Sequence, residues 1–186
     1  MKALLVIAQY PPILGGTEIK ARRLALQLAS SGHSVIVLTR ARHGLPPEES
    51  ADGVRVLRLP PEKGPFATLR FYFAAARKLK ELANEYDVIH NFLFSTLSIV
   101  CGKTAKKLGK PLIISVGGTG RYGGVSDKTG LGRFGALKWR LIKNLATGFI
   151  APSAACAKEL ECAGVPQARI FRSEEHTSEL QSRYVI

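Results

Sequence analysis

The fold is decided by residues 2–39, which read KALLVIAQYPPILGGTEIKARRLALQLASSGHSVIVLT. Residues 2–8 form a short apolar run of strand length, and residues 34–39 form a second run with little polar interruption. Between them, apolar residues repeat at the i, i+3, i+4, i+7 spacing of an amphipathic helix. These residues are Ala21, Leu24, Ala25 and Leu28. A strand, a helix and a second buried strand predict a βαβ unit whose two strands are parallel.

The same alternation continues to residue 171. Further strands are expected at residues 54–59, 87–90, 111–116 and 148–151. Further helices are expected at residues 65–83, 95–108, 131–146 and 153–163. Strands that alternate with helices predict one α/β domain built on a Rossmann-like, doubly wound parallel sheet.

Local signals refine these expectations. Thr17 and Ser153 are suited to cap the helices that follow them. Residues 40–52 are polar and are predicted to form a loop. The alternation of apolar residues with Arg55 and Arg58 is typical of a strand near the edge of a sheet.

Composition narrows the class of protein. The 186 residues are 46% hydrophobic and 22% charged, as in soluble globular proteins, and no apolar stretch approaches 18 residues. Three cysteines without a metal-type spacing are expected to be reduced thiols, which favours a cytoplasmic protein. A net charge of +13 favours anionic partners without choosing among them.

Residues 10–18, YPPILGGTE, follow the first strand and precede a helix. Gly15 and Gly16 would let backbone N–H groups approach a diphosphate at the positive end of that helix. Residues 10–18 match neither G-x-G-x-x-G nor G-x-x-x-x-G-K-[ST], so this turn is neither a dinucleotide fingerprint nor a P-loop. The alternative is a tight turn that needs a positive φ angle.

Six segments occur in an order and spacing that carry a resemblance. They are residues 11–18 (PPILGGTE), 32–39 (GHSVIVLT), 87–90 (DVIH), 109–120 (GKPLIISVGGTG), 148–153 (GFIAPS) and 163–170 (AGVPQARI). Together they resemble the N-terminal half of a GT-B glycosyltransferase of the GT4-like family, over nearly all of residues 1–171. The resemblance implies a second, C-terminal GT-B domain that is missing from this sequence.

The resemblance also implies an activity, which is the retaining transfer of a sugar from a nucleotide-sugar donor to an acceptor hydroxyl. The acceptor would be a glycan or a lipid-linked molecule, bound mainly by this half, while the missing half grips the nucleotide. No cofactor beyond the donor substrate is implied, and no D-x-D motif or ligand cluster suggests a metal. This half alone is expected to be inactive.

The resemblance carries over to few site residues. Gly15 and Gly16 match the family's glycine loop against the substrates, and Gly118 and Thr119 lie in the glycine-rich loop expected on the acceptor side. These four are the predicted substrate-binding residues.

No catalytic residue can be assigned. Where the family often has a functional histidine, this chain has Phe92, and His90 is expected to be structural. Asp127 is the one candidate base in the glycine-rich loop.

Two rival functions remain weaker. A Rossmann-type oxidoreductase would need a dinucleotide fingerprint and an acidic residue after the second strand, which instead ends in Thr39-Arg40. A nucleic-acid-binding module is favoured only by the charge, because no helix-turn-helix signature or RNP-like motif is present. We therefore expect no nucleic-acid partner.

Basic and aromatic residues gather in the predicted helix near residue 70. They are Phe66, Phe71, Tyr72, Arg70, Arg77, Lys78 and Lys80. A peripheral contact with anionic lipid at the inner face of the membrane is one interpretation, and an ordinary solvated helix face is the other.

The end of the chain breaks the pattern. Residues 172–182, RSEEHTSELQS, match one reading frame of a common sequencing-library adapter residue for residue. We therefore expect a domain over residues 1–171, followed by an unstructured, adapter-derived tail over residues 172–186.

Overall fold

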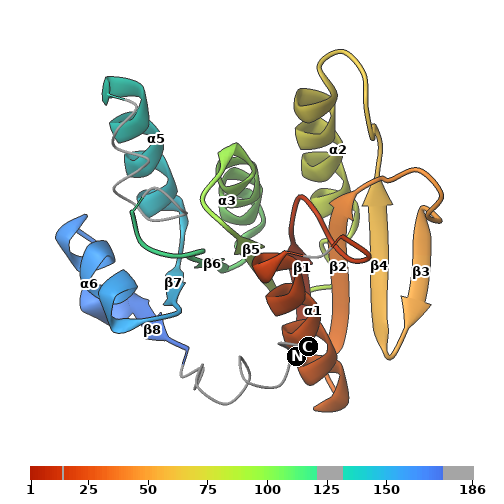
Figure 1. Cartoon of the computed structure of the whole chain (residues 1–186), viewed down its shortest axis with the longest axis horizontal. Coiled ribbons are helices and arrows are strands. Elements are labelled where there is room, and N and C mark those ends of the chain that lie inside the picture. The colour runs from red at the N-terminus through yellow and green to blue at the C-terminus, as the bar shows by residue number, and fades with distance from the viewer. Residues whose placement is uncertain (14, 121–131, 174–186) are drawn as a thin grey trace, which may run out of the picture.

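The computed structural model describes residues 1–13, 15–120 and 132–173. An eight-stranded sheet with the order β3-β4-β2-β1-β5-β6-β7-β8 forms its centre (Figure 1). The strands are β1 (Lys2–Val6), β2 (Ser34–Arg40), β3 (Glu48–Ala51), β4 (Val54–Leu59), β5 (Val88–Phe92), β6 (Leu112–Ser115), β7 (Gly148–Ala151) and β8 (Ile170–Arg172). All neighbouring pairs are parallel except β3 with β4. The predicted Rossmann-like α/β fold is confirmed.

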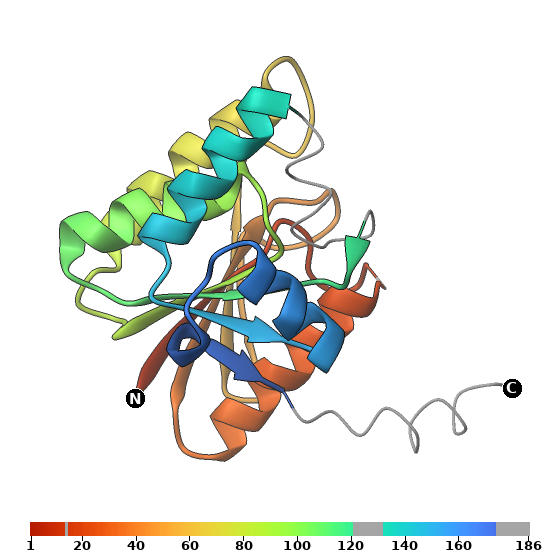
Figure 2. The same cartoon turned by 90° about the vertical axis from the view of Figure 1, so that its left-hand side faces the viewer.

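Helices cover both faces of the sheet. They are α1 (Gly16–Ser30), α2 (Ala67–Glu81), α3 (Thr96–Leu108), α5 (Gly132–Leu145), α6 (Ala154–Cys162) and the short 3₁₀ helix η2 (Gln167–Arg169). Helices α2, α3 and α5 lie side by side over one face, and α1 covers the other (Figure 2). The chain winds from β1 toward β2 first and returns to β5 later, so the direction reverses between β1 and β5. In open α/β sheets, ligands bind beyond the carboxyl ends of the strands at such a point.

The central strands are buried on both faces, as their apolar runs predict. In β1 and β2, Leu4, Val6, Val37 and Leu38 have no exposed surface. The larger core cluster lies against α2, α3 and α5, where Trp139 packs edge-on against Phe94 with ring centroids 5.3 Å apart. The smaller cluster lies under α1.

The prediction that residues 40–52 form only a loop is wrong, because β3 lies within them and pairs antiparallel with β4. The hairpin turns at Asp52 and Gly53, which have φ angles of 53° and 75°. Asp-Gly is a preferred pair for such a turn, but the polar EESA sequence of β3 has little strand propensity. Strand β4 lies next to the edge of the sheet, as its alternating pattern predicted, and because β3 covers it Arg58 is only 5% exposed.

Two of the predicted helix starts differ from the structure. Gly15, not Thr17, is the residue before the first turn of α1, and its carbonyl accepts from the Ile19 N–H at 3.0 Å. Helix α2 begins at Ala67, two residues after Pro65, where the helix was expected to start. The Ser153 cap is confirmed, since its hydroxyl accepts from the Cys156 N–H at 3.2 Å.

The sheet reaches one residue beyond the expected domain boundary. Arg172 pairs with Ala151 in the last strand, and the Ser173 N–H donates to the Ala151 carbonyl at 3.0 Å. These are backbone contacts, so they do not depend on the side chains at residues 172 and 173. Residues 174–186, the rest of the expected tail, lie outside the described residues.

A glycine sets the approach of two helices, which gives a test of the packing. A Cβ atom at Gly102 of α3 would lie 2.6 Å from the Leu145 Cβ of α5. We expect Gly102→Val to lower the free energy of unfolding by about 1–3 kcal/mol, because the crowded helices must move apart. Urea denaturation measures this change. Gly16→Ala is the matched control, since nothing lies within 4 Å of its added Cβ, and equal destabilisation by both variants would contradict the packing.

Candidate functional site

The predicted substrate-binding residues lie at one edge of the sheet. Seven strands run parallel and end at this edge, so the loops after them gather there. Gly15 and Gly16 follow β1, whereas Gly118 and Thr119 follow β6. Strand β5 lies between β1 and β6, which separates these two loops by roughly 10 Å, two strand spacings.

The glycine pair has no need of a positive φ angle, which removes the alternative of a strained tight turn. Gly15 is extended, with a φ of −146°. A Cβ atom at Gly15 would meet the Glu18 carboxylate, the mobile end of a side chain, whereas none of the described atoms lies within 4 Å of a Cβ at Gly16. Packing within the described residues therefore does not require glycine at position 16, and the space beside the start of α1 is open.

A buried hydrogen-bond network joins β1, β5 and α3 between the two glycine loops. Asn91 is fully buried; its Nδ2 donates to the Val6 carbonyl at 3.0 Å. Its Oδ1 accepts from the Ser98 hydroxyl at 2.6 Å. The same hydroxyl oxygen accepts from the Ser95 N–H at 3.1 Å, at the start of α3. Sequence reasoning missed this network, although a polar residue inside a buried strand was a signal for it.

Leu93, next to this network, holds a backbone conformation that side chains rarely adopt, with a φ of 68°. Its N–H donates to the Ser115 carbonyl at 3.0 Å, and its carbonyl lies 3.0 Å from the Ser98 hydroxyl. Strained backbone of this kind costs about 1–3 kcal/mol and occurs most often near functional sites. The loop between β5 and α3 is thereby held rigidly at the carboxyl edge.

His90 is a buried, neutral histidine rather than an exposed base. Its Nε2 lies 2.7 Å from the Ser115 hydroxyl, and its ring stacks on Phe92 with centroids 4.5 Å apart. Burial lowers the pKa of His90 to about 4, and the charge of Lys20 contributes further. Both the geometry and the pKa agree with the predicted structural role.

The other candidates do not complete a catalytic set. Phe92 is 3% exposed and packs in the core, so its position carries no acid or base. Asp127 lies outside the described residues. The Gly120 N–H, at the start of the glycine-rich loop, donates to the Glu159 carboxylate of α6 at 3.3 Å. The described part of the loop is thereby tied to α6.

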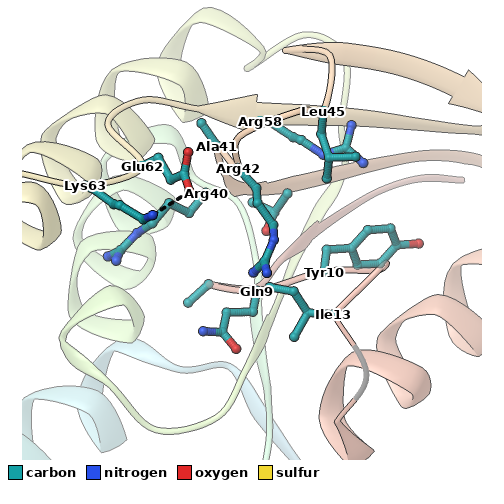
Figure 3. A pocket seen from close by; sticks show the side chains of 12 residues that line it. Gln9, Tyr10, Ile13, Arg40, Ala41, Arg42, Leu45, Arg58, Glu62 and Lys63 are labelled. Atoms are coloured by element: carbon teal, nitrogen blue, oxygen red, sulfur yellow. Dashed lines mark ion pairs between the residues drawn. The ribbon is translucent and has the colours of Figure 1, made fainter.

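A cavity of about 190 Å³ opens beyond the ends of β1, β2 and β4 (Figure 3). Its charged lining residues are Arg40, Arg42, Arg58, Glu62 and Lys63. Sequence reasoning used the Thr39-Arg40 pair only to argue against an oxidoreductase and did not group these cations. The available signal was Arg40 at the end of one buried strand and Arg58 on its parallel neighbour.

Within residues 1–13, 15–120 and 132–173, no group of three or more His, Cys, Asp or Glu side chains is placed to hold a metal ion. No helix in the same ranges has the length and apolar character needed to cross a bilayer.

The buried histidine predicts a pH dependence of stability. The unfolded His90 takes up a proton near pH 6.5, whereas the folded one does so near pH 4. The unfolded state therefore binds more protons in this window, and stability falls as the pH drops through it. We expect the free energy of unfolding to fall by about 2 kcal/mol from pH 7.5 to pH 5, measured by urea denaturation.

In His90→Gln this decrease should become much smaller. The control His43→Gln changes an exposed loop residue and should keep the full decrease. An equal pH response of His90→Gln and the unaltered chain would contradict a buried neutral His90.

Comparison with known proteins gives the relationship of the chain. Residues 15–172 match the family described as glycosyl transferase 4-like domain. Glycogen synthase of Mycobacterium tuberculosis strain H37Rv is 38% identical over 64 residues, which cover 31% of this chain and 16% of that protein. The matched part is thus a small fraction of that relative's length.

Solved structures show the same fold. Anabaena Alr3699/HepE in complex with UDP-glucose superposes with a TM-score of 0.62 at 18% identity, over 92% of this chain and 43% of that one. The UDP-GlcNAc 2-epimerase of Neisseria meningitidis, bound to UDP-GlcNAc, gives 0.63 at 16% identity, over 93% and 46%. The chain therefore corresponds to one half of GT-B proteins, as expected. Since the family match covers most of its length, the chain belongs to the glycosyl transferase 4-like domain family.

Proposed function

We propose that this domain is the acceptor-side half of an enzyme that transfers a sugar from a nucleotide-sugar donor to an acceptor hydroxyl, with retention of anomeric configuration. The observation that carries the proposal is the family match, which begins at Gly15 and runs through every strand from β2 to β8. The complexes of the solved relatives with UDP-sugars support a nucleotide-sugar donor. A glycan or lipid-linked molecule is the proposed acceptor.

The glycine loops are the proposed contacts with the substrates. The open space beside Gly16, at the first turn of a 15-residue helix, suits an oxygen-rich group that accepts from backbone N–H groups. Gly118 and Thr119 would contact the acceptor from the other loop. The two loops flank the point between β1 and β5 where the direction of winding reverses.

The remaining steps belong to the proposed C-terminal domain. There, basic side chains would hold the diphosphate and stabilise the charge that develops on the leaving group. No metal ion is required for that step. The domain by itself is proposed to be inactive, because it lacks those contacts.

Replacing Gly16 tests the function and the site together. In the intact enzyme we expect Gly16→Val to lower the rate of sugar transfer at least tenfold, because its branched side chain would fill the ligand's space. The melting temperature should hardly change, since the added Cβ meets none of the described atoms. Transfer from labelled UDP- and GDP-sugars to a panel of acceptors measures the rate.

The matched variant Gly16→Ala adds one methyl group and should lose less activity than Gly16→Val. A Gly16→Val enzyme that works within twofold of the unaltered one would overturn the placement of the substrate. Complete absence of transfer by the unaltered enzyme, with all donors and acceptors, would count against the function itself.

We also propose a peripheral contact between α2 and anionic lipid. The predicted patch needs one correction, because Phe71 is fully buried in the core. Phe66, Leu69 and Phe73 are instead 79%, 52% and 69% exposed. Arg70 lies among these apolar residues, and Arg77, Lys78 and Lys80 follow in the later turns of the helix. Lys78 and Arg77 are ion-paired with Glu81 at 2.7 and 3.2 Å. An apolar and basic helix surface suits binding at the level of lipid headgroups.

Vesicle binding tests this contact. We expect the domain to bind vesicles containing phosphatidylglycerol more than phosphatidylcholine vesicles, and high salt should weaken the binding. Phe73→Ser should reduce the binding severalfold in a flotation assay. Ile19→Ser changes an exposed residue of α1, the helix on the opposite face of the sheet, and as the control it should leave the binding unchanged. Equal binding to both vesicle types would show that the charges form an ordinary solvated surface.

A further inference from the structure

The cavity at the ends of β2 and β4 contains polar atoms that the protein does not satisfy. Thr39 is 1% exposed and lines the cavity, yet its hydroxyl has no hydrogen-bond partner among the described residues. The buried Nε of Arg40, its neighbour in the chain, likewise has none. A buried polar group without a partner is costly, and such groups are rare in folded proteins. The side chains of Thr39 and Arg40 point to opposite faces of β2, and both residues line the cavity at the end of that strand. Unpartnered donors on this lining indicate a surface shaped for a ligand.

The cations of the cavity differ in how far the protein already uses them. Arg58 is neutralised, since it donates to the Glu49 carboxylate at 2.9 Å and to the Pro46 carbonyl at 3.1 Å. Arg40 is partly used, because its guanidinium stacks over Phe71 at 4.8 Å and donates to the Thr68 hydroxyl at 3.3 Å. These contacts hold the end of β2 against α2 and position the guanidinium at the cavity.

The positive charges of two further cations are little neutralised by the protein. The Arg42 guanidinium makes no hydrogen bond or ion pair with the described residues, and the side chain reaches down toward Gln9 (Figure 3). Lys63 has a single loose ion pair, 3.9 Å from the Glu62 carboxylate, and its side chain is 86% exposed. Among the described lining residues Glu62 is the one carboxylate, and it opposes anion binding only in part. The cavity therefore keeps a net positive charge beside two unsatisfied donors.

The size of the cavity limits its ligand. Sites for whole drug-sized molecules hold about 300–1,000 Å³, and this cavity holds about 190 Å³. It is thus too small for a complete nucleotide sugar and suits one terminal group. A phosphate monoester is nearly dianionic at neutral pH and offers three strongly accepting oxygens. Arginine is well suited to bind such a group through two parallel hydrogen bonds.

We propose that this cavity binds a phosphate monoester on the acceptor, held by Arg40, Arg42 and Lys63 and by the Thr39 hydroxyl. The assignment to the acceptor rests on the proposed function, in which the C-terminal half holds the donor diphosphate. A phosphate anchored beyond β2 and β4 would leave the rest of the acceptor to extend along the carboxyl edge toward β1 and β5. The domain would then select phosphorylated acceptors over neutral ones.

Calorimetric titration of the full 186-residue chain tests the proposal, at constant ionic strength, with glucose 6-phosphate and with glucose as the uncharged probe. We expect glucose 6-phosphate to bind at least tenfold more tightly than glucose. Arg42→Ala and Thr39→Val should each weaken its binding at least fivefold. Thr39→Val should do so without lowering the melting temperature, because it removes a hydroxyl that has no partner. Arg140→Ala, which removes an exposed arginine of α5, is the matched control and should leave the affinity unchanged.

The alternatives give different results. Equal weakening by Arg140→Ala, or no preference for glucose 6-phosphate, would overturn the site and reveal only attraction to a basic surface. Tighter binding of UDP-glucose that the same two variants abolish would overturn the assignment to the acceptor. Vesicles of phosphatidic acid present the same monoester on a lipid, so their Arg42-dependent binding would support the site and identify a lipid source.

The proposed function is tested separately. If the intact enzyme transfers sugar to neutral acceptors and the chain ignores glucose 6-phosphate, the phosphate site fails while the function stands. If the chain binds glucose 6-phosphate as described and the intact enzyme transfers no sugar, the site stands and the function fails.

Discussion

The structure depends on the burial of β1, which is hydrogen-bonded along both edges and covered on both faces. Its Leu4 lies opposite Ile36 of β2 and Ile89 of β5, and all three side chains are at most 4% exposed. Apolar residues on both faces leave no solvent-facing side, so helices must cover the sheet above and below. Parallel pairing on both edges then places the end of β1 beside the ends of its neighbours. The first glycine loop, the Asn91 network and the cationic cavity share one edge for this reason.

This edge contains two different electrostatic environments. Near β5 and β6, polar groups are deeply buried and fully paired, and the imidazole of His90 is kept neutral because ionisation there would require burying a charge. Near β2 and β4, cations face a hollow and the Thr39 hydroxyl has no partner within the described residues. The first environment is a buried, hydrogen-bonded base for the edge of the sheet. The second is a positively charged surface whose unpaired polar groups would be satisfied by a bound anion.

Six of the eight strands were predictable because each is encoded locally; the exceptions are β3 and β8. Strand β2 is a run of apolar residues, which predicts a strand buried on both faces. Ser153 is recognisable as a helix cap because serine is a preferred capping residue. Strand β3 was not predictable from the sequence, because its stability comes from its pairing with β4 and not from the propensity of its own residues. The phosphate-type cavity was equally hidden, since it combines Arg40 and Arg42, at the end of β2, with Lys63 from the loop after β4. The glycine pair was found as a motif, while its extended φ and open surroundings are properties of the folded chain.

The β3–β4 hairpin has a consequence for how separate copies of the molecule behave toward one another. An outermost strand exposes unpaired backbone groups, and a flat apolar one invites the sheet of a second molecule to add to it. Here the outermost strand is only four residues long and carries Glu48, whose carboxylate is held by Arg55 at 2.6 Å. Arg55 also reaches Glu85 at 2.8 Å, so charged groups occupy this margin of the sheet. A strand that adds little to the core thus protects this edge of the sheet against edge-to-edge aggregation.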